Sequence, residues 1–122
     1  MVAEDNRVNQ TLAAKVLGKR GHSVTIADNG AIAVDLATHG GFDLILMDIQ
    51  MPVLSGLEAT RMIRERESLR GHRTPIIALT ACALKEDEEK CRAAGMDDYI
   101  SKPINSQVLL DKVSQLTAAI EA

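Results

Sequence analysis

The short apolar run at residues 42–52, FDLILMDIQMP, constrains the fold more than any other segment of the chain. Its apolar residues follow one another without the gaps of an amphipathic helix, and the run is too short for a buried helix. The pattern predicts a strand buried on both faces, as strands of parallel sheets are. Asp48 would then lie at the carboxyl end of this strand, at the edge of an open α/β sheet where ligands bind. Taken by itself, Asp48 could equally be an acid that caps a loop.

Four other short segments are predicted to be strands. Residues 1–3 look like the end of a strand whose beginning is missing, and polar and apolar residues alternate at 23–26. Residues 76–80 form a second apolar run with β-branched side chains, which predicts another buried strand. Residues 98–102 are weakly apolar and are followed by Pro103, as expected for an edge strand.

Helices are predicted between these strands from apolar spacing and capping residues. The first follows Asn6 and the last follows Ser106, both plausible N-caps, and the others begin near Ile32, Leu57 and Ala83. The apolar faces expected to be buried comprise Val8, Leu12, Val16 and Leu17 in the first helix, and Val108, Leu109, Val113, Leu116 and Ile120 in the last. This alternation of strands and helices predicts one parallel sheet with helices on both faces and right-handed crossovers.

Composition limits the function. With 122 residues, 46% hydrophobic content and 2% aromatic content, the chain has the size and core of one domain but few side chains that could stack on bases. Its formal charge of −3 argues against nucleic-acid binding. Apolar runs are too short to cross a membrane, and Cys82 and Cys91 fit neither a disulfide framework nor a zinc site. We therefore expect a cytoplasmic domain with reduced thiols and no membrane contact.

A basic cluster starts on the predicted third helix. Its members are Arg61, Arg64, Arg66, Arg70, His72 and Arg73. Cations near the end of a helix complement its dipole and keep its outer face solvated. We therefore predict that these residues form a solvated face, and we favour that interpretation over a binding site.

Chemistry-bearing residues follow four of the predicted strands. Glu4 and Asp5, Asp48, Thr80 and Lys102 stand at the carboxyl ends of parallel strands, which meet at one edge of a sheet. Neighbouring carboxylates repel one another by about 4 kcal/mol per close pair at an effective dielectric of 20. That repulsion is large beside a net stability of roughly 5 to 15 kcal/mol, so it needs an offset.

A divalent cation would supply this offset. Mg²⁺ prefers oxygen ligands and binds through one or two carboxylates together with phosphate, Lys102 can neutralise remaining charge, and Thr80 can donate to an anion. The predicted edge has no histidine to act as a base and no glycine-rich loop to hold a nucleotide. The residues therefore predict a site that accepts a phosphoryl group on a carboxylate.

The sequence resembles the receiver domains of two-component signalling, the phospho-accepting modules of response regulators and hybrid sensor histidine kinases. The residues that carry the resemblance are Glu4-Asp5-Asn6, Asp48, Met51-Pro52, Gly56, Thr80-Ala81 and Lys102-Pro103. With Asn9-Gln10, the start of the chain looks most like the receivers of hybrid sensor histidine kinases. The resemblance implies a single receiver domain over residues 1–122, its first strand truncated at the N-terminus. It also implies a flavodoxin-like α/β fold with a doubly wound five-stranded parallel sheet, order 2-1-3-4-5, and five helices.

The resemblance also implies roles for the residues at the sheet edge. Asp48 would be the phosphorylated residue, and Mg²⁺ would be held by Glu4, Asp5, Asp48 and the backbone carbonyl of Gln50. Thr80 and Lys102 would contact the phosphoryl oxygens. Thr80 and Tyr99 would form the switch that changes the surface around the fourth helix and fifth strand, although Tyr99 could be only a half-buried edge aromatic. The chain would catalyse nothing beyond its own phosphorylation and dephosphorylation.

By the same resemblance, the phosphoryl donor is a phosphohistidine on a histidine kinase or a histidine phosphotransfer domain. It would dock beside the first helix and the loop after Lys102, where Arg7, Val8, Thr11 and Ile104 could line the contact. The parent polypeptide could be a hybrid histidine kinase, and the oligomeric state stays open.

Three positions depart from or adjust the family pattern. Ser55 replaces an acid that often precedes Gly56, and Gln50 and Cys82 occupy positions that tune the lifetime of the phosphate in the family. Two alternatives remain: a pseudo-receiver that acts only through protein contacts, and a phosphatase of the haloacid-dehalogenase type. The phosphatase would need a second acid two residues after its nucleophile, where this chain has Gln50.

Overall fold

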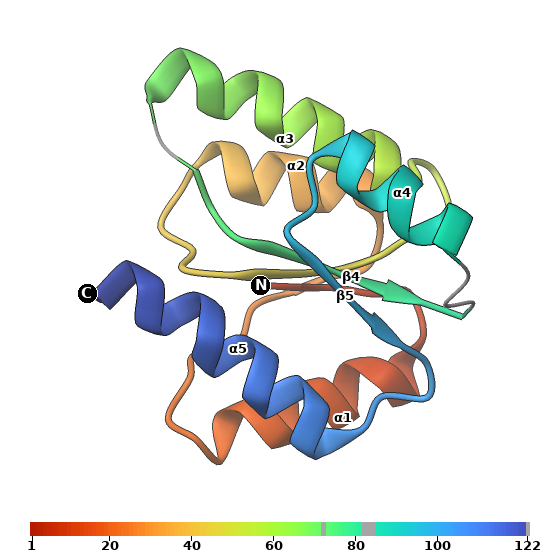
Figure 1. Ribbon diagram of the computed structural model, residues 1–122, viewed down its shortest axis with the longest axis vertical. Helices are drawn as coiled ribbons and strands as arrows, with labels where there is room; N and C mark the ends of the chain where they lie inside the picture. Colours follow the sequence, from red (N-terminus) through yellow and green to blue (C-terminus); the bar gives the residue numbers. More distant parts are fainter. Residues whose placement is uncertain (72, 82–84, 122) are drawn as a thin grey trace.

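Strands and helices alternate along the whole chain (Figure 1). The structure is a computed structural model that describes residues 1–71, 73–81 and 85–121. Its elements are β1 (Val2–Ala3), α1 (Arg7–Gly18), β2 (Ile26–Ala27), α2 (Gly30–Thr38), β3 (Ile45–Asp48), α3 (Gly56–Arg70), β4 (Ile76–Thr80), α4 (Lys85–Ala94), β5 (Asp98–Ser101) and α5 (Ser106–Glu121).

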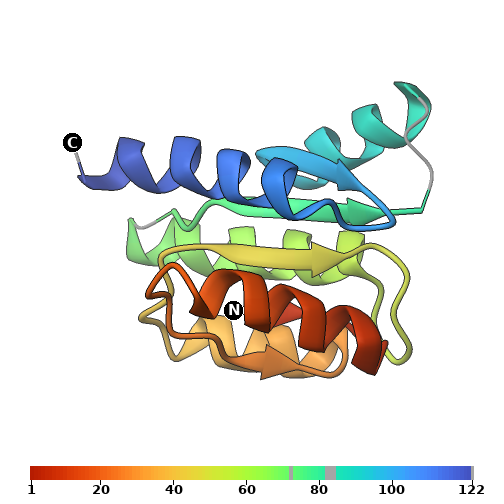
Figure 2. The same ribbon diagram turned by 90° about the horizontal axis from the view of Figure 1, so that it is seen from below.

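The strands form one parallel sheet in the order β2-β1-β3-β4-β5, and in Figure 2 the arrows of β2, β3, β4 and β5 point the same way. β1 has only two residues but pairs on both sides, so that Val2 lies opposite Ile26 and Leu46. β3 pairs with β4 over four residues, ending with Asp48 opposite Leu79. The predicted flavodoxin-like topology is confirmed.

Helices cover both faces of the sheet: α1 and α5 lie on one side, and α2, α3 and α4 on the other (Figure 1). Because side chains alternate along a strand, β3 supplies both cores. Ile45 and Met47 join the apolar cluster that includes residues of α2, α3 and α4, whereas Leu46 joins the cluster that includes residues of α1 and α5. Full burial of both faces explains why residues 45–47 are all apolar.

Helix starts are set by side-chain caps. Asn6 Oδ1 accepts from the backbone N–H groups of Val8 and Asn9, as predicted. In α5, Asn105 accepts from the N–H groups of Gln107 and Val108, so the cap lies one residue before the predicted Ser106. The predicted helix start at Ala83 and the side chain of Ile120 lie outside the described residues, and so does His72 of the basic cluster.

The helix faces were predicted less well than the helices themselves. Val8 is 75% exposed, which contradicts its predicted place on the buried face of α1. Arg64 was assigned to a solvated face, but its side chain is only 13% exposed. Its guanidinium donates to the carbonyls of Gly95 at 2.9 Å and Thr74 at 2.7 Å, and pairs with Asp97 at 2.8 Å. The prediction was wrong because Arg64 binds the loop between α4 and β5, which lies far along the chain.

Candidate functional site

The residues predicted to form a site lie at the carboxyl ends of four strands, on the side to which the arrows point in Figure 2. Glu4 and Asp5 follow β1, Asp48 ends β3, Thr80 ends β4 and Lys102 follows β5. Parallel strands bring these positions to one edge although up to 98 residues separate them in sequence, from Glu4 to Lys102.

Three carboxylates form the acidic part of this site. Glu4, Asp5 and Asp48 each offer an oxygen, and these oxygens lie within 4.8 Å of one another. Asp5 is exposed, whereas Glu4 and Asp48 are buried, with relative exposures of 0% and 3%. An all-oxygen donor set of concentrated negative charge with one side open to solvent fits a hard divalent cation such as Mg²⁺.

Lys102 neutralises part of this charge. Its Nζ lies 3.0 Å from Glu4 Oε1 and 2.9 Å from Asp48 Oδ2, so it bridges the two buried carboxylates. Burial by itself would lower the pKa of Lys102, but Asp48 and Glu4 outweigh it and raise that pKa above its ordinary value. The ammonium therefore stays charged at neutral pH.

The two buried carboxylates differ in pKa. Burial, followed by the contact with Glu4, raises the pKa of Asp48 to about 7, although Lys102 opposes the change. Burial also acts to raise the pKa of Glu4, but hydrogen bonds with Asp48, Lys102 and Asn9 outweigh it and lower that pKa. Of the two carboxyls, Asp48 therefore binds a proton more readily. A bound cation would favour its ionised form.

The loop after β3 holds the Asp48 carboxylate and the start of α3. The backbone N–H of Gln50 donates to Asp48 Oδ1 at 3.2 Å, which puts the backbone of Gln50 beside the acidic cluster. A Cβ on Gly56 would lie 2.0 Å from the carbonyl oxygen of Asp48, so α3 can start this close to β3 only with glycine. Gly56, which follows Ser55, therefore has a steric role.

Val53 was not singled out from the sequence. It has φ 71°, an outlier for a β-branched residue, and the turn around it is closed by a 2.8 Å hydrogen bond from Leu54 N–H to the carbonyl of Pro52. Its side chain is 81% exposed. Nothing in the residue type signals this conformation, because glycine or asparagine is the usual choice there.

The two proposed switch residues lie on neighbouring strands. Thr80 is buried at the end of β4, and its carbonyl accepts from Lys102 N–H at 2.7 Å. Tyr99 on β5 is half-buried, and Lys112 Nζ lies 5.9 Å from the centre of its ring while also pairing with Asp98 at 3.0 Å. Their switching roles stay predictions, and Cys82 lies outside the described residues.

The predicted docking residues do not all reach the surface. Arg7, Val8 and Thr11 are exposed along α1. Ile104 is only 8% exposed and packs in the core cluster under α1 and α5, so it is a poor docking residue. The Lys102–Pro103 peptide bond just before it is cis.

The contacts of two side-chain amides with Glu4 were not predicted. Asn9 Nδ2 donates to Glu4 Oε1 at 2.6 Å, and Gln10 Nε2 donates to the main-chain carbonyl of Glu4 at 2.5 Å. From the sequence, both residues were linked to the site only through the family resemblance. The available signal was their place in the first turn of a helix that directly follows an acidic strand end.

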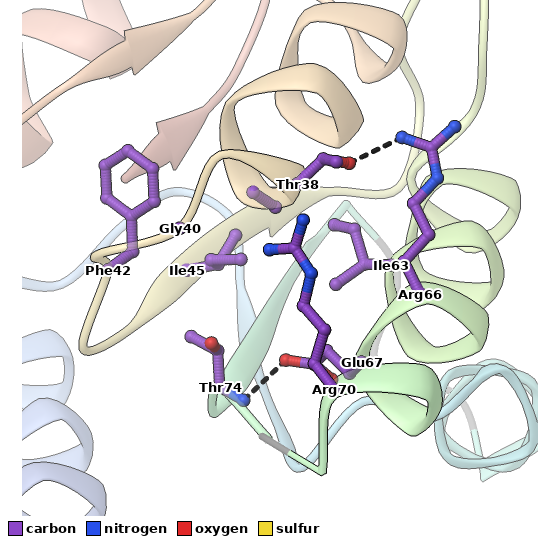
Figure 3. A pocket seen from close by; sticks show the side chains of 10 residues that line it. Thr38, Gly40, Phe42, Ile45, Ile63, Arg66, Glu67, Arg70 and Thr74 are labelled. Carbon is purple, nitrogen blue, oxygen red and sulfur yellow. Dashed lines mark hydrogen bonds between the residues drawn. The ribbon is translucent and has the colours of Figure 1, made fainter.

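A small pocket between α2 and α3 lies away from this site (Figure 3). It is lined by Ile45 and Thr74 at the amino ends of β3 and β4, and Arg66 beside it donates to Thr38. Its volume of about 30 Å³ leaves room for a few water molecules at most and is far below the roughly 300 Å³ of a small-molecule pocket. The pocket therefore offers no rival ligand site.

Comparison with known proteins agrees with the geometry. A family model described as "Response regulator receiver domain" matches residues 1–114. The chain is 50% identical over 119 residues to hybrid signal transduction histidine kinase I of Dictyostelium discoideum, covering 93% of this chain but 7% of that kinase. It is 45% identical over 105 residues to the polar-differentiation response regulator DivK of Brucella anthropi, covering 86% of this chain and 84% of that protein.

Solved structures give the same result. One contains the receiver domain of the Saccharomyces cerevisiae response regulator Ssk1 with the phosphotransfer protein Ypd1, at TM-score 0.93 and 37% identity, covering 96% of this chain and 86% of that chain. The receiver domain of Pseudomonas aeruginosa sensor histidine kinase PA1611, with magnesium in its active-site cleft, has TM-score 0.86 and 44% identity, covering 96% and 94%.

Within the part of the chain that the structure describes, none of the helices combines the length and apolar character needed to cross a bilayer. The family match, the relatives and the acidic site at the strand ends all identify the same kind of domain. The chain belongs to the response regulator receiver domain family of two-component signalling.

Proposed function

We propose that this receiver domain takes a phosphoryl group from a phosphohistidine onto Asp48, with Mg²⁺ as cofactor. The observation that carries the proposal is the buried Asp48 carboxylate, held 2.9 Å from Lys102 Nζ in a cluster with Glu4 and Asp5. A structural acid would gain little from two further carboxylates beside it, whereas a phosphoryl acceptor needs the cation that they can hold.

The transfer needs the ionised carboxylate of Asp48. One of its oxygens attacks the phosphorus of a phosphohistidine that is protonated on its other ring nitrogen. A P–O bond forms as the P–N bond breaks, the electron pair stays on nitrogen, and the ring leaves as neutral imidazole. Asp48 Oδ1 is oriented by the N–H of Gln50 at 3.2 Å and Oδ2 by Lys102 at 2.9 Å. These contacts orient the nucleophilic carboxylate. The Lys102 ammonium can then move from the carboxylate to the phosphoryl oxygens as they gain negative charge.

Mg²⁺ would be held by Glu4, Asp5, Asp48 and the backbone carbonyl of Gln50, and would neutralise charge on the carboxylates and the phosphoryl oxygens. The oxygen cluster of Glu4, Asp5 and Asp48 supports this assignment. Magnesium in the cleft of the PA1611 receiver domain supports it independently.

The phosphoryl group would act as a switch through Thr80 and Tyr99. It adds about −1.5 to −2 charges, and each charge-assisted hydrogen bond contributes about 1.5 to 3 kcal/mol. Because inverting a 1:99 equilibrium takes about 5.5 kcal/mol, two or three new contacts from Thr80, Lys102 and a backbone amide would suffice. The half-buried position of Tyr99 opposite Ala78, on the strand that ends at Thr80, supports its part in the response.

The donor would be a histidine kinase or a histidine phosphotransfer protein, and the complex of the related Ssk1 receiver with Ypd1 supports the second. Arg7, Val8 and Thr11 form an exposed stripe on α1 that could contact it. We further propose that residues 1–122 are one domain of a hybrid histidine kinase in the cytoplasm. The similarity to a Dictyostelium kinase supports this parentage, while the match to DivK makes a stand-alone regulator the rival.

Transfer from a phosphorylated histidine phosphotransfer protein tests the proposal. In the presence of Mg²⁺ the wild-type domain should gain label and Asp48→Asn should gain none. An Arg7→Glu variant should be labelled more slowly by this donor but at the wild-type rate by acetyl phosphate, which has no docking surface. A folded wild-type domain that binds neither Mg²⁺ nor beryllofluoride would instead be a pseudo-receiver, and turnover of a small phosphate ester would indicate a phosphatase.

A further inference from the structure

We propose that Asn9 is a positioning residue of the acceptor site, whose side-chain amide fixes the Glu4 carboxylate so that one carboxylate oxygen stays available to a divalent cation. This inference rests on the proposed function and assigns a role to a residue outside the predicted metal and phosphoryl ligands. The inference rests on the contacts of Glu4, which is fully buried. A buried carboxylate can adopt only the orientation that its hydrogen-bond donors allow.

The contacts of Glu4 divide unequally between its two oxygens. Oε1 accepts from Asn9 Nδ2 at 2.6 Å and lies 3.0 Å from Lys102 Nζ, while Oε2 accepts from the backbone N–H of Asp5 at 3.1 Å. A carboxylate oxygen has about two acceptor positions. Once Asp48 is ionised and shares no proton with Glu4, the donors of Oε1 fill that oxygen, and Oε2 keeps one position for the cation or a water bound to it.

The position of Asn9 is itself fixed by the helix start. Asn6 caps α1 and accepts from Asn9 N–H at 3.1 Å, which holds Asn9 in the first turn directly behind the β1 strand end. From there its side chain reaches back to Glu4. Because an ionised carboxylate only accepts hydrogen bonds, the NH₂ side of the Asn9 amide must face it.

Asn9 becomes more important when the site is loaded. In the proposed function Lys102 turns from the carboxylates to the phosphoryl oxygens, which removes one of the two donors of Glu4 Oε1. Asn9 has no such competing partner in the proposed chemistry and stays on Oε1. The Asn9 amide therefore keeps the orientation of Glu4 the same before and after the phosphoryl group arrives.

Gln10 provides a matched control. It is the next residue in α1 and carries the same amide, but its Nε2 donates to the main-chain carbonyl of Glu4 at 2.5 Å and to Asp28 Oδ1 at 2.9 Å. It therefore ties α1 to the same strand end without touching the Glu4 carboxylate. Any effect of Asn9 that Gln10 does not share comes from orienting the carboxylate.

The test is the Mg²⁺ dissociation constant, measured by isothermal titration calorimetry on the wild type and on Asn9→Leu, Asn9→Ala, Asn9→Gln and Gln10→Leu. Thermal unfolding in EDTA identifies the variants that fold. Removing a group that orients a metal ligand typically weakens binding about 10- to 100-fold, so we expect at least about tenfold for Asn9→Leu and Asn9→Ala. Asn9→Gln should recover part of the loss, and Gln10→Leu should stay close to the wild type.

Labelling with acetyl phosphate gives a second readout. Asn9→Ala should be labelled slowly at limiting Mg²⁺ but at the wild-type rate at saturating Mg²⁺, because Asn9 contacts neither Asp48 nor the phosphoryl group. A folded Asn9→Ala with the wild-type dissociation constant, or an equal loss in Gln10→Leu, would overturn the inference. Wild-type protein that binds Mg²⁺ but takes no label would refute the proposed function while leaving the Asn9 comparison valid. Wild-type protein that binds no Mg²⁺ would refute both.

Discussion

Replacing Asp48 with asparagine removes one charge from a crowded, buried cluster, and we expect the metal-free protein to become more stable. Asp48 is 3% exposed and lies with Glu4 and Asp5 in a group whose oxygens are within 4.8 Å. Asparagine has nearly the same shape, and its single oxygen can accept from Gln50 N–H or from Lys102, which bond to different oxygens of Asp48. The variant therefore loses the unfavourable charge but little packing.

The magnitude follows from the pKa of Asp48. The pKa of this carboxyl rises from 3.8 to about 7 on folding. Each pKa unit corresponds to about 1.4 kcal/mol, so the ionised form lowers the free energy of unfolding by about 4 kcal/mol in total. Glu4 has a lowered pKa because of its contacts, including that with Asp48, so part of this cost is offset within the pair. We expect Asp48→Asn to gain about 1 to 3 kcal/mol at pH 8.

The sign of the pH dependence is also fixed. Between pH 3.8 and about 7 folded Asp48 keeps a proton that the unfolded chain has lost, so its contribution to stability falls as pH rises through this window. Glu4, with its lowered pKa, stabilises the fold by a constant amount above its ordinary value of 4.5 and loses this contribution only at lower pH. Burial lowers the pKa of the Met1 ammonium to about 6, but this group titrates equally in both proteins. The gap between them should therefore widen from pH 5 to pH 8.

Urea unfolding in EDTA, followed by far-ultraviolet circular dichroism because the chain has no tryptophan, measures this gap. Asp35→Asn is the control, since the Asp35 side chain is 76% exposed and its loss should change stability by less than about 0.5 kcal/mol. An Asp48→Asn protein that is no more stable than the wild type at pH 8, or a gap that stays constant from pH 5 to pH 8, would refute the reasoning.

Two further substitutions test packing around the site and the sheet. Gly56→Ala should lower the free energy of unfolding in urea by about 3 kcal/mol, because its Cβ would meet the Asp48 carbonyl. Gly18→Ala is the control and should leave the stability unchanged, because nothing lies within 4 Å of its Cβ. Equal effects of the two substitutions would contradict the steric role of Gly56. Arg64→Met should also lose about 3 kcal/mol, because Asp97 keeps its charge with fewer partners. Arg73→Met removes an ion pair from an arginine 61% exposed and should lose less than about 1 kcal/mol; a similar loss for both would mean that burial of Arg64 is irrelevant.

The chemistry at the sheet edge could be predicted because it depends on local patterns. The apolar runs that became β3 and β4 located two strand ends, and parallel geometry placed Asp48 and Thr80 at the same edge. The order of the strands needed more than patterns, because β1 has only two residues and pairs on both sides. The family resemblance supplied that order.

Contacts that depend on how separate elements pack against one another could not be predicted. Helical spacing put Arg64 on an outer face, but its partners Gly95 and Asp97 are more than 30 residues away in a loop whose path spacing does not determine. The contact of Asn9 with Glu4 likewise depends on the angle between β1 and α1. Val53 gave no signal at all, because a β-branched residue is the least expected choice for a positive φ.

The central claim is that Asp48 accepts a phosphoryl group, and intact-mass measurement after incubation with acetyl phosphate and Mg²⁺ tests it most directly. The wild-type domain should gain the mass of one phosphoryl group, and the gain should disappear with EDTA and in Asp48→Asn. Folding of the variant is verified by the unfolding experiments above. A folded Asp48→Asn protein that gains the same mass, or a wild-type protein labelled at another residue, would contradict the account.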